Sequence, residues 1–146
     1  MQKVIIENQN NPPGLRIAAT MVAGRSSTAT GVRRLAALVG KSGELDVDLA
    51  IMYSLLNSVT DTAIHLFMTI LQSNSHAKLR EMAAYCLGQA GNNLAVKPLT
   101  AVITNKSENV LVRSKAAEAL GMLSDPFAVN ALIQIVNDES PEIRFW

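Results

Sequence analysis

The hydrophobic and polar positions of this chain repeat with a period near 32 residues. The clearest copies are Leu79–Gly88 and Val112–Gly121, which share an apolar residue, an arginine, an alanine pair and a Leu-Gly step in one order. A degraded copy runs over Leu15–Gly24, a weaker copy begins at Val47, and the start of a fifth lies at Ile143. A fixed period of this size is typical of proteins in which each repeat is one supersecondary unit.

A second apolar block follows each of the first four copies in constant phase. Four apolar residues lie eleven positions after the last residue of the first block: Leu35, Phe67, Leu99 and Leu132. Each is followed by apolar residues three and four positions later, which puts them on one face of a helix. Each repeat is therefore predicted to hold two helices of about ten to thirteen residues.

The segments between these blocks carry cap residues. Gly88, Gly91 and Gly121 lie where the first helix of a pair is expected to end, and glycine tolerates the left-handed conformation found there. Ser124–Pro126 is expected to start a helix, because it combines a capping side chain with a proline in the first turn. The alanine pairs are expected at helix contacts, since small side chains permit close approach.

These motifs resemble the short HEAT-like repeats of the phycobilisome-lyase type. The resemblance is strongest over Leu79–Trp146, where Asp125–Val129 and Asp138–Arg144 are close to the family pattern. The second copy departs from the pattern, with Asp48 in place of the arginine and Leu56 in place of the glycine. The resemblance implies an all-α fold, an α-solenoid of stacked antiparallel helix pairs. It also implies binding to other proteins, and in some members a role in enzymes that attach or detach bilin pigments.

We expect a single HEAT-like repeat domain over residues 1–146, with four repeats led by Leu15, Val47, Leu79 and Val112 and a fifth truncated at residues 143–146. A helix pair cannot bury its own apolar face, so the repeats must stack. Since both ends look cut, the chain is predicted to be a segment of a longer repeat protein. The alternative is a small protein that dimerises through open ends. Either way, self-association through the C-terminal end is expected.

Composition agrees with closely packed helices. Alanine occurs 19 times, and aromatic residues make up only 4% of the chain. A net charge of +1 gives no strong field toward nucleic acid or acidic lipid, and no apolar run reaches the ~18 residues that span a membrane. Cys86 is the one cysteine, so no internal disulfide can form. We expect a cytoplasmic protein without a membrane partner.

No constellation of catalytic or metal-ligating residues appears in the sequence. His65 and His76 have no partner at the spacing of a metal site. Cys86 falls on a predicted buried stripe, where an inert thiol is expected. We therefore expect no enzyme activity, cofactor or metal, unless the chain is part of a lyase complex.

One arginine recurs in each of four copies, at Arg16, Arg80, Arg113 and Arg144. A catalytic residue rarely recurs in this way, whereas a structural residue does. We expect an arginine ladder that hydrogen-bonds between repeats, to a carboxylate or to carbonyl groups at helix ends.

The variable positions of the first helices are predicted to form a partner-binding face. They are three to four residues apart, so they share one side of each helix, and in the related repeats this helix lines the concave surface. Methionine and tyrosine recur among them, and both suit a contact surface. The predicted contact residues are Ile17, Met21, Leu49, Tyr53, Glu81, Met82, Tyr85, Gln89, Lys115, Glu118 and Met122. The alternative is that packing contacts bury these side chains.

The first hypothesis for function is a non-enzymatic scaffold that binds a protein or peptide on this concave face. The second is a subunit of a bilin lyase or of another complex that handles phycobiliproteins. A nucleic-acid-binding solenoid is third, because residues 1–43 hold six basic groups and one acid. Arg25, Arg33, Arg34 and Lys41 could form a phosphate-binding patch there. Since no aromatic residues are interleaved, a solvated face is the favoured interpretation.

Overall fold

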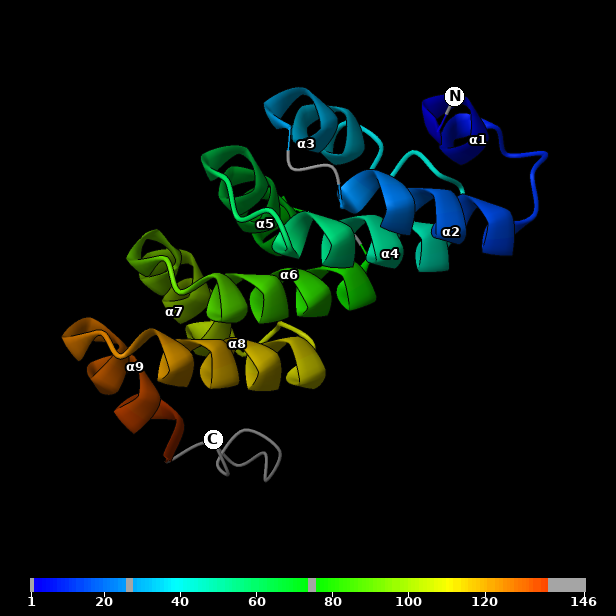
Figure 1. Ribbon diagram of the computed structural model, residues 1–146. Coiled ribbons are helices and arrows are strands. Elements are labelled where there is room, and N and C mark those ends of the chain that lie inside the picture. The colour runs from blue at the N-terminus through cyan, green and yellow to red at the C-terminus, as the bar shows by residue number, and fades with distance from the viewer. Residues whose placement is uncertain (1, 26–27, 74–75, 137–146) are drawn as a thin grey trace. The chain divides into compact units, whose positions relative to one another are not determined.

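The described part of the chain is built of helices joined by turns (Figure 1). The computed structural model describes all residues except 1, 26–27, 74–75 and 137–146. The helices are α1 (Gln2–Glu7), α2 (Pro13–Gly24), α3 (Ala29–Ala36), α4 (Leu45–Leu56), α5 (Asp61–Ser73), α6 (Ala77–Ala90), the 3-10 turn η1 (Asn93–Ala95), α7 (Val96–Thr104), α8 (Val110–Leu123) and α9 (Pro126–Val136). The predicted all-α fold and its helix pairs are confirmed over these residues.

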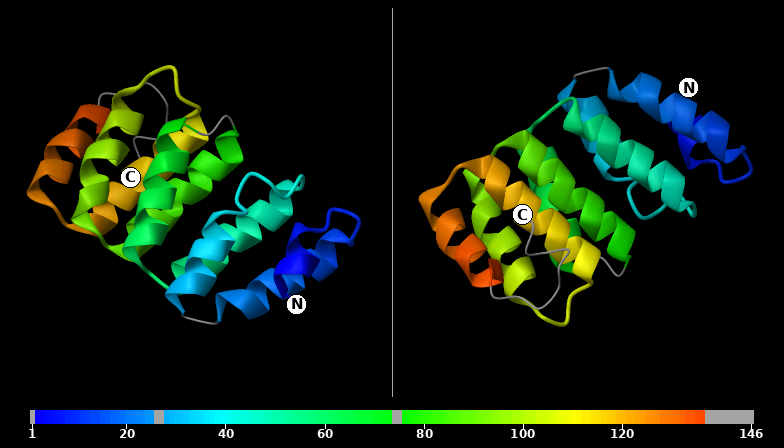
Figure 2. Two further views of the ribbon diagram at one scale, coloured as in Figure 1. Left: turned by 90° about the horizontal axis from the view of Figure 1, so that it is seen from above. Right: turned by 90° about the horizontal axis from the view of Figure 1, so that it is seen from below.

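The chain divides into two compact units, Met1–Leu66 and Phe67–Trp146. In the first unit, α2 packs on α1 and α4, and α3 packs on α2 and α4 (Figure 2). Apolar side chains from all four helices are buried between them. They are Ile6, Ala19, Val32, Leu35, Val47, Ile51 and Leu55.

The second unit has two layers of helices. The first helices of the two repeats, α6 and α8, lie side by side, and the second helices, α7 and α9, pack together behind α8. The side chains buried between the layers are those that the repeat pattern places on the inner faces. They are Leu79, Ala83, Ala84, Leu87, Leu99, Ile103, Val112, Ala116, Ala117 and Leu120.

Local capping sets several helix boundaries. The backbone amide of Phe127 donates to the Asp125 carboxylate at 2.8 Å, and α9 begins at Pro126 as predicted. The side chain of Asn109 accepts from the amide of Leu111 at the start of α8. α3 is shorter than the apolar pattern predicts, because the chain turns after Ala36.

The expectation that Gly88 and Gly121 cap their helices is wrong. Both lie inside helices, and the residues with left-handed backbone follow later: Gly91, with φ of 68°, ends α6, and Ser124, with φ of 51°, ends α8. Of the three glycines, only Gly91 has the expected role.

Gly88 is needed for close helix contact. A Cβ added to Gly88 would lie 2.8 Å from both the Cα and the Cβ of Ala119, closer than side-chain carbons pack. Gly24 is placed in the same way in the first unit, where an added Cβ would overlap the side chain of Ser54. The glycine of the motif therefore lets two successive first helices approach, α2 to α4 and α6 to α8.

The recurring arginines bind main-chain carbonyls at the ends of preceding helices. Arg16 is buried in α2 and donates from Nε to the carbonyl of Ile6 in α1 at 2.8 Å. Arg113 of α8 donates from Nε and Nη2 to the carbonyl of Ile103 in α7, at 3.2 and 3.0 Å. In both pairs the acceptor lies ten residues before the arginine, so the repeat itself places the bond.

Two of these arginines also bind the segment that leads into the next first helix, in α2 and in α6. Arg16 Nη2 donates to the carbonyl of Ser42, shortly before α4. Arg80 binds the carboxylate of Glu108, shortly before α8, through two bonds of 2.9 and 2.6 Å. The acceptors are the two kinds expected from the sequence. Arg144 lies outside the described residues.

Asp48 occupies the ladder position in α4 without disturbing that helix. It is only 6% exposed. Its Oδ1 atom has no hydrogen-bond partner among the residues that the structure describes.

The two lead-motif glycines of the second unit should respond oppositely to alanine. Gly88→Ala forces α6 and α8 apart, so the free energy of unfolding should fall by about 1–3 kcal/mol. A Cβ added at Gly121 has no atom within 4 Å. Because Gly121 is an exposed helical glycine, Gly121→Ala should raise the free energy of unfolding by up to about 1 kcal/mol. Urea denaturation followed by circular dichroism measures both. Equal effects of the two substitutions would contradict the close-contact role of Gly88.

The Arg80–Glu108 pair should make stability depend on pH. Burial alone would raise the pKa of Glu108, but the hydrogen bonds from Arg80 and from the Asn109 amide, with the charge of Arg80, outweigh it and hold the pKa below its ordinary value. The ionised carboxylate therefore stabilises the fold above the unfolded-state pKa of about 4.3, and this stabilisation is lost as the pH falls through the lower folded-state pKa.

Glu108→Gln should accordingly lower the free energy of unfolding by about 1–3 kcal/mol at pH 7, and the difference from wild type should shrink between pH 5 and pH 3. Glu118→Gln is the matched control. Its partner Lys115 is one turn away on the same helix surface, so the expected loss is only about 0.2–0.5 kcal/mol. A difference for Glu108→Gln that stays constant with pH would refute the assignment.

Candidate partner-binding face

In the second unit, the predicted contact residues of α6 and α8 meet along one accessible face. The ammonium group of Lys115 lies 5.9 Å from the centroid of the Tyr85 ring, within the range of a cation–π contact. The side-chain amide of Gln89 lies 3.7 Å from the sulfur of Met122. These two contacts join α6 to α8, so the residues form one surface.

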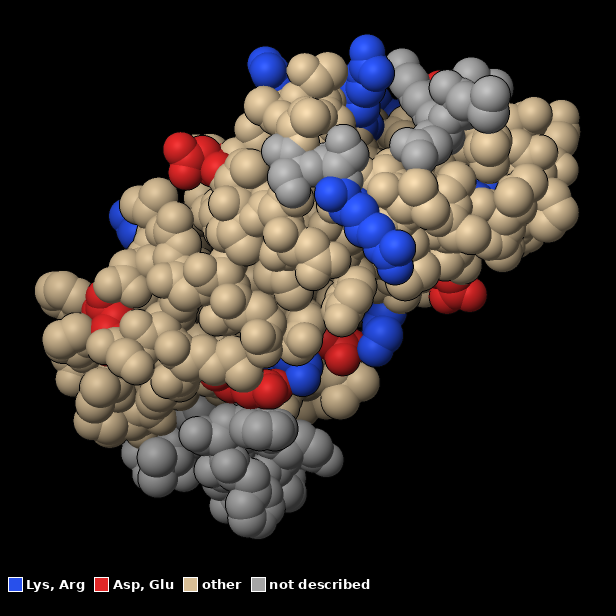
Figure 3. Space-filling view, in the orientation of Figure 1, with Lys and Arg blue, Asp and Glu red and all other residues tan. Residues whose placement is uncertain are grey.

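Charges on this face are paired over short distances. Lys115 binds Glu118 at 2.6 Å, and Lys78 binds Glu81 at 3.2 Å, both one helical turn apart. Figure 3 shows the result as neighbouring blue and red groups amid largely uncharged surface. The face thus offers a partner mainly uncharged contact area, with Tyr85 held in place by Lys115.

The first unit presents a comparable set of side chains on α2 and α4. Met21 is 50% exposed and Tyr53 is 49% exposed, whereas Ile17 and Leu49 are half-buried beside them. None of the eleven predicted contact residues belongs to the buried class. Four of them are exposed, namely Met21, Tyr53, Gln89 and Met122, and the other seven are half-buried.

Three further apolar residues on α2 and α8 are exposed and were not among the predicted contacts: Leu15, Val22 and Leu111. Leu111 is 55% exposed and precedes Lys115 by one turn of α8, which places it on the same face. Val22 is 52% exposed and adjoins Met21. The spacing of Leu111 from Lys115 predicts that Leu111 lies on this face, but Leu111 precedes Val112, where the repeat motif begins.

The histidines and the cysteine of the described ranges lie apart from one another in the sequence, at positions 65, 76 and 86. They contain no group of three or more His, Cys, Asp or Glu side chains that could hold a metal ion. His65 lies exposed on α5, and His76 precedes α6. Cys86 is fully buried, and burial raises the pKa of its thiol to about 12. None of the helices so described has the length and apolar character needed to cross a membrane.

The sequence matches the model of a known protein family. The model of HEAT repeats matches residues 64–146, more than half of the sequence. This chain belongs to the HEAT repeat family. The finer assignment to the phycobilisome-lyase type is not distinguished by this match. A comparison with curated proteins found no match.

The fold of nearly the whole chain, and not only of residues 64–146, resembles that of a solved structure. Human deoxyhypusine hydroxylase, in complex with glycerol, resembles this HEAT repeat protein with a TM-score of 0.70. The similarity covers 99% of this chain and 69% of that one, at 21% sequence identity. At this level of identity the likeness concerns the fold, and it agrees with the α-solenoid class predicted from the repeats.

The buried thiol gives a test of the chemistry at Cys86. Because its pKa of about 12 leaves almost no thiolate at pH 8, the native protein should react with Ellman's reagent at least about a thousandfold more slowly than the unfolded protein, whose thiol has a pKa near 8.5. Absorbance at 412 nm, with and without urea, measures both rates. Similar rates in the two states would mean that Cys86 is accessible and reactive.

Proposed function

We propose that this HEAT repeat protein is a non-enzymatic scaffold that binds a protein or peptide partner on the face of its first helices. The observation that carries the proposal is the exposure of large uncharged side chains on the first helices. Met21 and Tyr53 are at matching positions of successive repeats, and Met122 is at the variable position that follows the motif glycine. Met21, Tyr53 and Met122 are 50, 49 and 44% exposed. Tyrosine and methionine are enriched at the centres of protein interfaces, where their burial contributes to affinity.

The pairing of charges on α6 and α8 indicates what kind of partner would fit. Lys115 and Glu118 neutralise one another, so the face has no strong field to attract a highly charged ligand. An apolar or amphipathic segment would bury Tyr85 and Met122 and leave the ion pairs at the rim. Leu111 extends this contact area toward the start of α8.

Two alternatives would connect this protein with an enzyme. Membership of a bilin-lyase complex is motivated by the motif at Asp138–Arg144, which lies outside the described residues. The hydroxylase of similar fold is an enzyme by name, but one fold hosts many functions. A bilin absorption band that shifts on mixing with this protein would favour the first of these over a scaffold.

Self-association, cellular location and nucleic-acid binding are further parts of the proposal. Self-association through residues 143–146 concerns a segment outside the described ranges. Phe127 and Ile133 of α9, which are 78 and 58% exposed, favour such a contact. A cytoplasmic location is also part of the proposal, because a single cysteine allows no internal disulfide. Nucleic-acid binding by the whole solenoid stays the third choice.

Removing the large side chains of the face should abolish partner capture. In a pull-down from extract of the source organism, Tyr53→Ala/Met82→Ala/Tyr85→Ala should recover at least about tenfold less partner than wild type, because truncation of one interface anchor alone costs 1.4 kcal/mol or more. Quantitative mass spectrometry measures the recovery, and circular dichroism checks that the helices remain.

The matched control is Val59→Ala/Leu94→Ala. These two side chains are 50 and 64% exposed but belong to none of the first helices, so their loss should leave recovery within twofold of wild type. Unchanged recovery by the triple variant, with intact helices, would refute the proposed face. Equal losses in the triple variant and the control would show nonspecific adhesion.

A further inference from the structure

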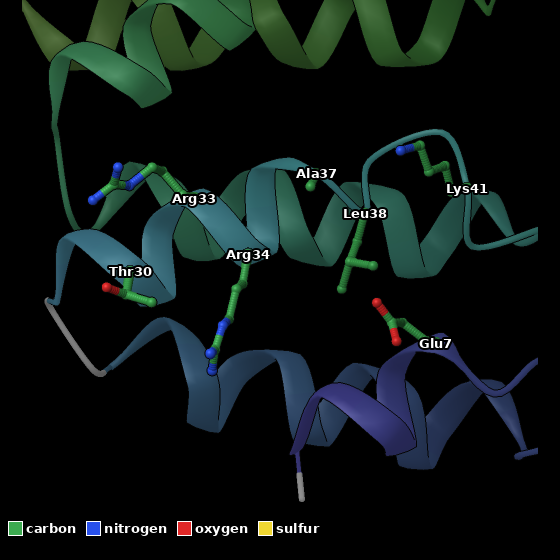
Figure 4. Close-up of a pocket in the computed structure, with 7 residues that line it drawn as sticks. All are labelled: Glu7, Thr30, Arg33, Arg34, Ala37, Leu38 and Lys41. Atoms are coloured by element: carbon green, nitrogen blue, oxygen red, sulfur yellow. The ribbon is translucent and has the colours of Figure 1, made fainter.

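The basic residues beside α3 do not converge on one site. A pocket of about 410 Å³ lies against this helix, and Arg33, Arg34 and Lys41 contribute to its lining. In Figure 4, Arg33 and Lys41 lie on one side of α3 and Arg34 lies on the other. Glu7, at the end of α1, adds a carboxylate to the same lining. These cations therefore point in different directions and do not enclose a single anion.

A groove in the second unit has walls that do face one another. The second helices α7 and α9 pack side by side, as Figure 2 shows, and a pocket of about 470 Å³ lies between them. On each helix the lining residues are one, three or four positions apart, which puts them on one side of that helix. They are Val96, Lys97 and Thr100 of α7 and Phe127, Asn130 and Ala131 of α9.

The groove has an apolar floor beside an exposed aromatic ring. Val96 and Ala131 are 8 and 3% exposed and form the floor. Phe127 lines the same groove and is 78% exposed. Covering such a ring with another apolar group is favourable, and aromatic rings contribute more than their buried area alone. Floor and ring together therefore form a socket for one apolar side chain of a ligand.

Two carboxamide groups flank this socket on opposite walls. Asn93 lies in η1, directly before α7, and Asn130 lies on α9. Both residues are exposed, and within the described residues neither side chain makes a hydrogen bond. A carboxamide offers an acceptor oxygen and two N–H donors, which complement the N–H and C=O groups of a peptide. The two side chains can therefore hold a peptide main chain at two points.

Opposite charges also lie on the two walls of the groove. Lys97 on α7 is exposed, and among the described residues its ammonium group makes no ion pair. Asp125, directly before α9, accepts the amide of Phe127 on Oδ1 at 2.8 Å, which fixes the carboxylate and leaves Oδ2 for a ligand. The lining is thus neutral as a whole and complements a ligand that carries both an acidic and a basic group.

We propose that the groove between α7 and α9 binds an extended peptide segment of a partner protein. An aromatic side chain of that segment occupies the socket, where it packs on Val96 and Ala131 and contacts the ring of Phe127. An acidic and a basic residue on either side of it meet Lys97 and Asp125. The volume is that of pockets that enclose a small group. This site shares no residue with the face of the first helices and does not rest on it.

The lining favours a peptide over a nucleic acid or a small apolar molecule. A nucleic-acid strand binds along a track of cations, whereas the one lysine of this groove is offset by Asp125. A small apolar molecule fills the socket but leaves both carboxamides without a partner. A peptide satisfies the socket, the carboxamides and both charges at once.

Three defined probes, titrated into the full chain by nuclear magnetic resonance, separate these contributions. N-acetyl-tryptophanamide carries an aromatic ring between two peptide groups, N-acetyl-alaninamide keeps only the peptide groups, and indole keeps only the ring. The first should bind at least about tenfold more tightly than the second, because an aromatic anchor supplies most of such a contact. It should also bind at least about threefold more tightly than indole and shift the side-chain amide signals of Asn93 and Asn130.

The charges are tested with two pentapeptides, acetyl-Asp-Gly-Trp-Gly-Lys-amide and acetyl-Lys-Gly-Trp-Gly-Asp-amide. Since opposite charges lie on opposite walls, one order should fit better than the other. The better one should bind at least about threefold more tightly than the same peptide with serine at both charged positions, which is the size expected of exposed ion pairs. Charged peptides that bind no better than the serine peptide would contradict the roles of Lys97 and Asp125.

Phe127→Ala/Asn130→Ala should weaken binding of N-acetyl-tryptophanamide at least about tenfold. Both side chains are exposed, so the helices should remain intact, which circular dichroism checks. The matched control is Val129→Ala/Ile133→Ala on the same helix. These side chains are 54 and 58% exposed but do not line the groove, so their loss should change binding less than about twofold.

Equal binding of the tryptophan and alanine probes, equal losses in both variants, or binding of indole as tight as that of N-acetyl-tryptophanamide would each overturn the proposal. Ultracentrifugation of the free chain tests a second copy as the occupant. A dimer that Phe127→Ala/Asn130→Ala dissociates, and the control leaves intact, would assign the groove to self-association instead. The pull-down with Tyr53→Ala/Met82→Ala/Tyr85→Ala leaves this groove unchanged, so a failure of the first-helix face is distinguishable from a failure here.

Discussion

The fold depends on the close approach of successive first helices. In the second unit that approach has no room for one additional carbon at Gly88 beside Ala119, and in the first unit none at Gly24 beside Ser54. Because the backbones are so near, alanine suffices to fill the contact, and the apolar area needed for stability comes from many small interdigitating groups. The large side chains at variable positions are thereby left toward solvent. The same constraint that closes the core therefore creates the candidate partner-binding face.

The arginines divide into two groups with different physical roles. Arg16, Arg80 and Arg113 satisfy carbonyl or carboxylate oxygens at helix ends, where an unpaired polar group would cost free energy. Arg33 and Arg34 of α3 are exposed, and the printed bond of Arg33 goes to the carbonyl of Ala29, one turn earlier in the same helix. A positive charge that is compensated within the fold cannot attract a ligand, whereas an uncompensated one can. Exposed positive charge is therefore found on α3 in the first unit, although the whole chain carries a net charge of only +1.

Membership of the HEAT repeat family defines the architecture of this chain, whereas activity depends on the side chains that the architecture exposes. HEAT repeats form an extended scaffold, and the similar fold of deoxyhypusine hydroxylase shows that such a scaffold can also serve an enzyme. Function belongs to the site and not to the fold. In the described part of this chain the candidate site is the set of Tyr and Met side chains left exposed or half-buried on the first helices.

The repeat period, the helix pairs, the start of α9 at Pro126 and the kinds of acceptor used by the arginines could all be predicted from the sequence, because each follows from local spacing and capping. Helical periodicity also indicated that the eleven candidate contact residues share one side of their helices, and none of them is buried. Only the tertiary structure decided that Gly88 serves a helix contact instead of a cap, since that role depends on Ala119, 31 residues away. It alone brought Glu7 to the basic side of α3, because pockets are formed by segments whose contact no local pattern records.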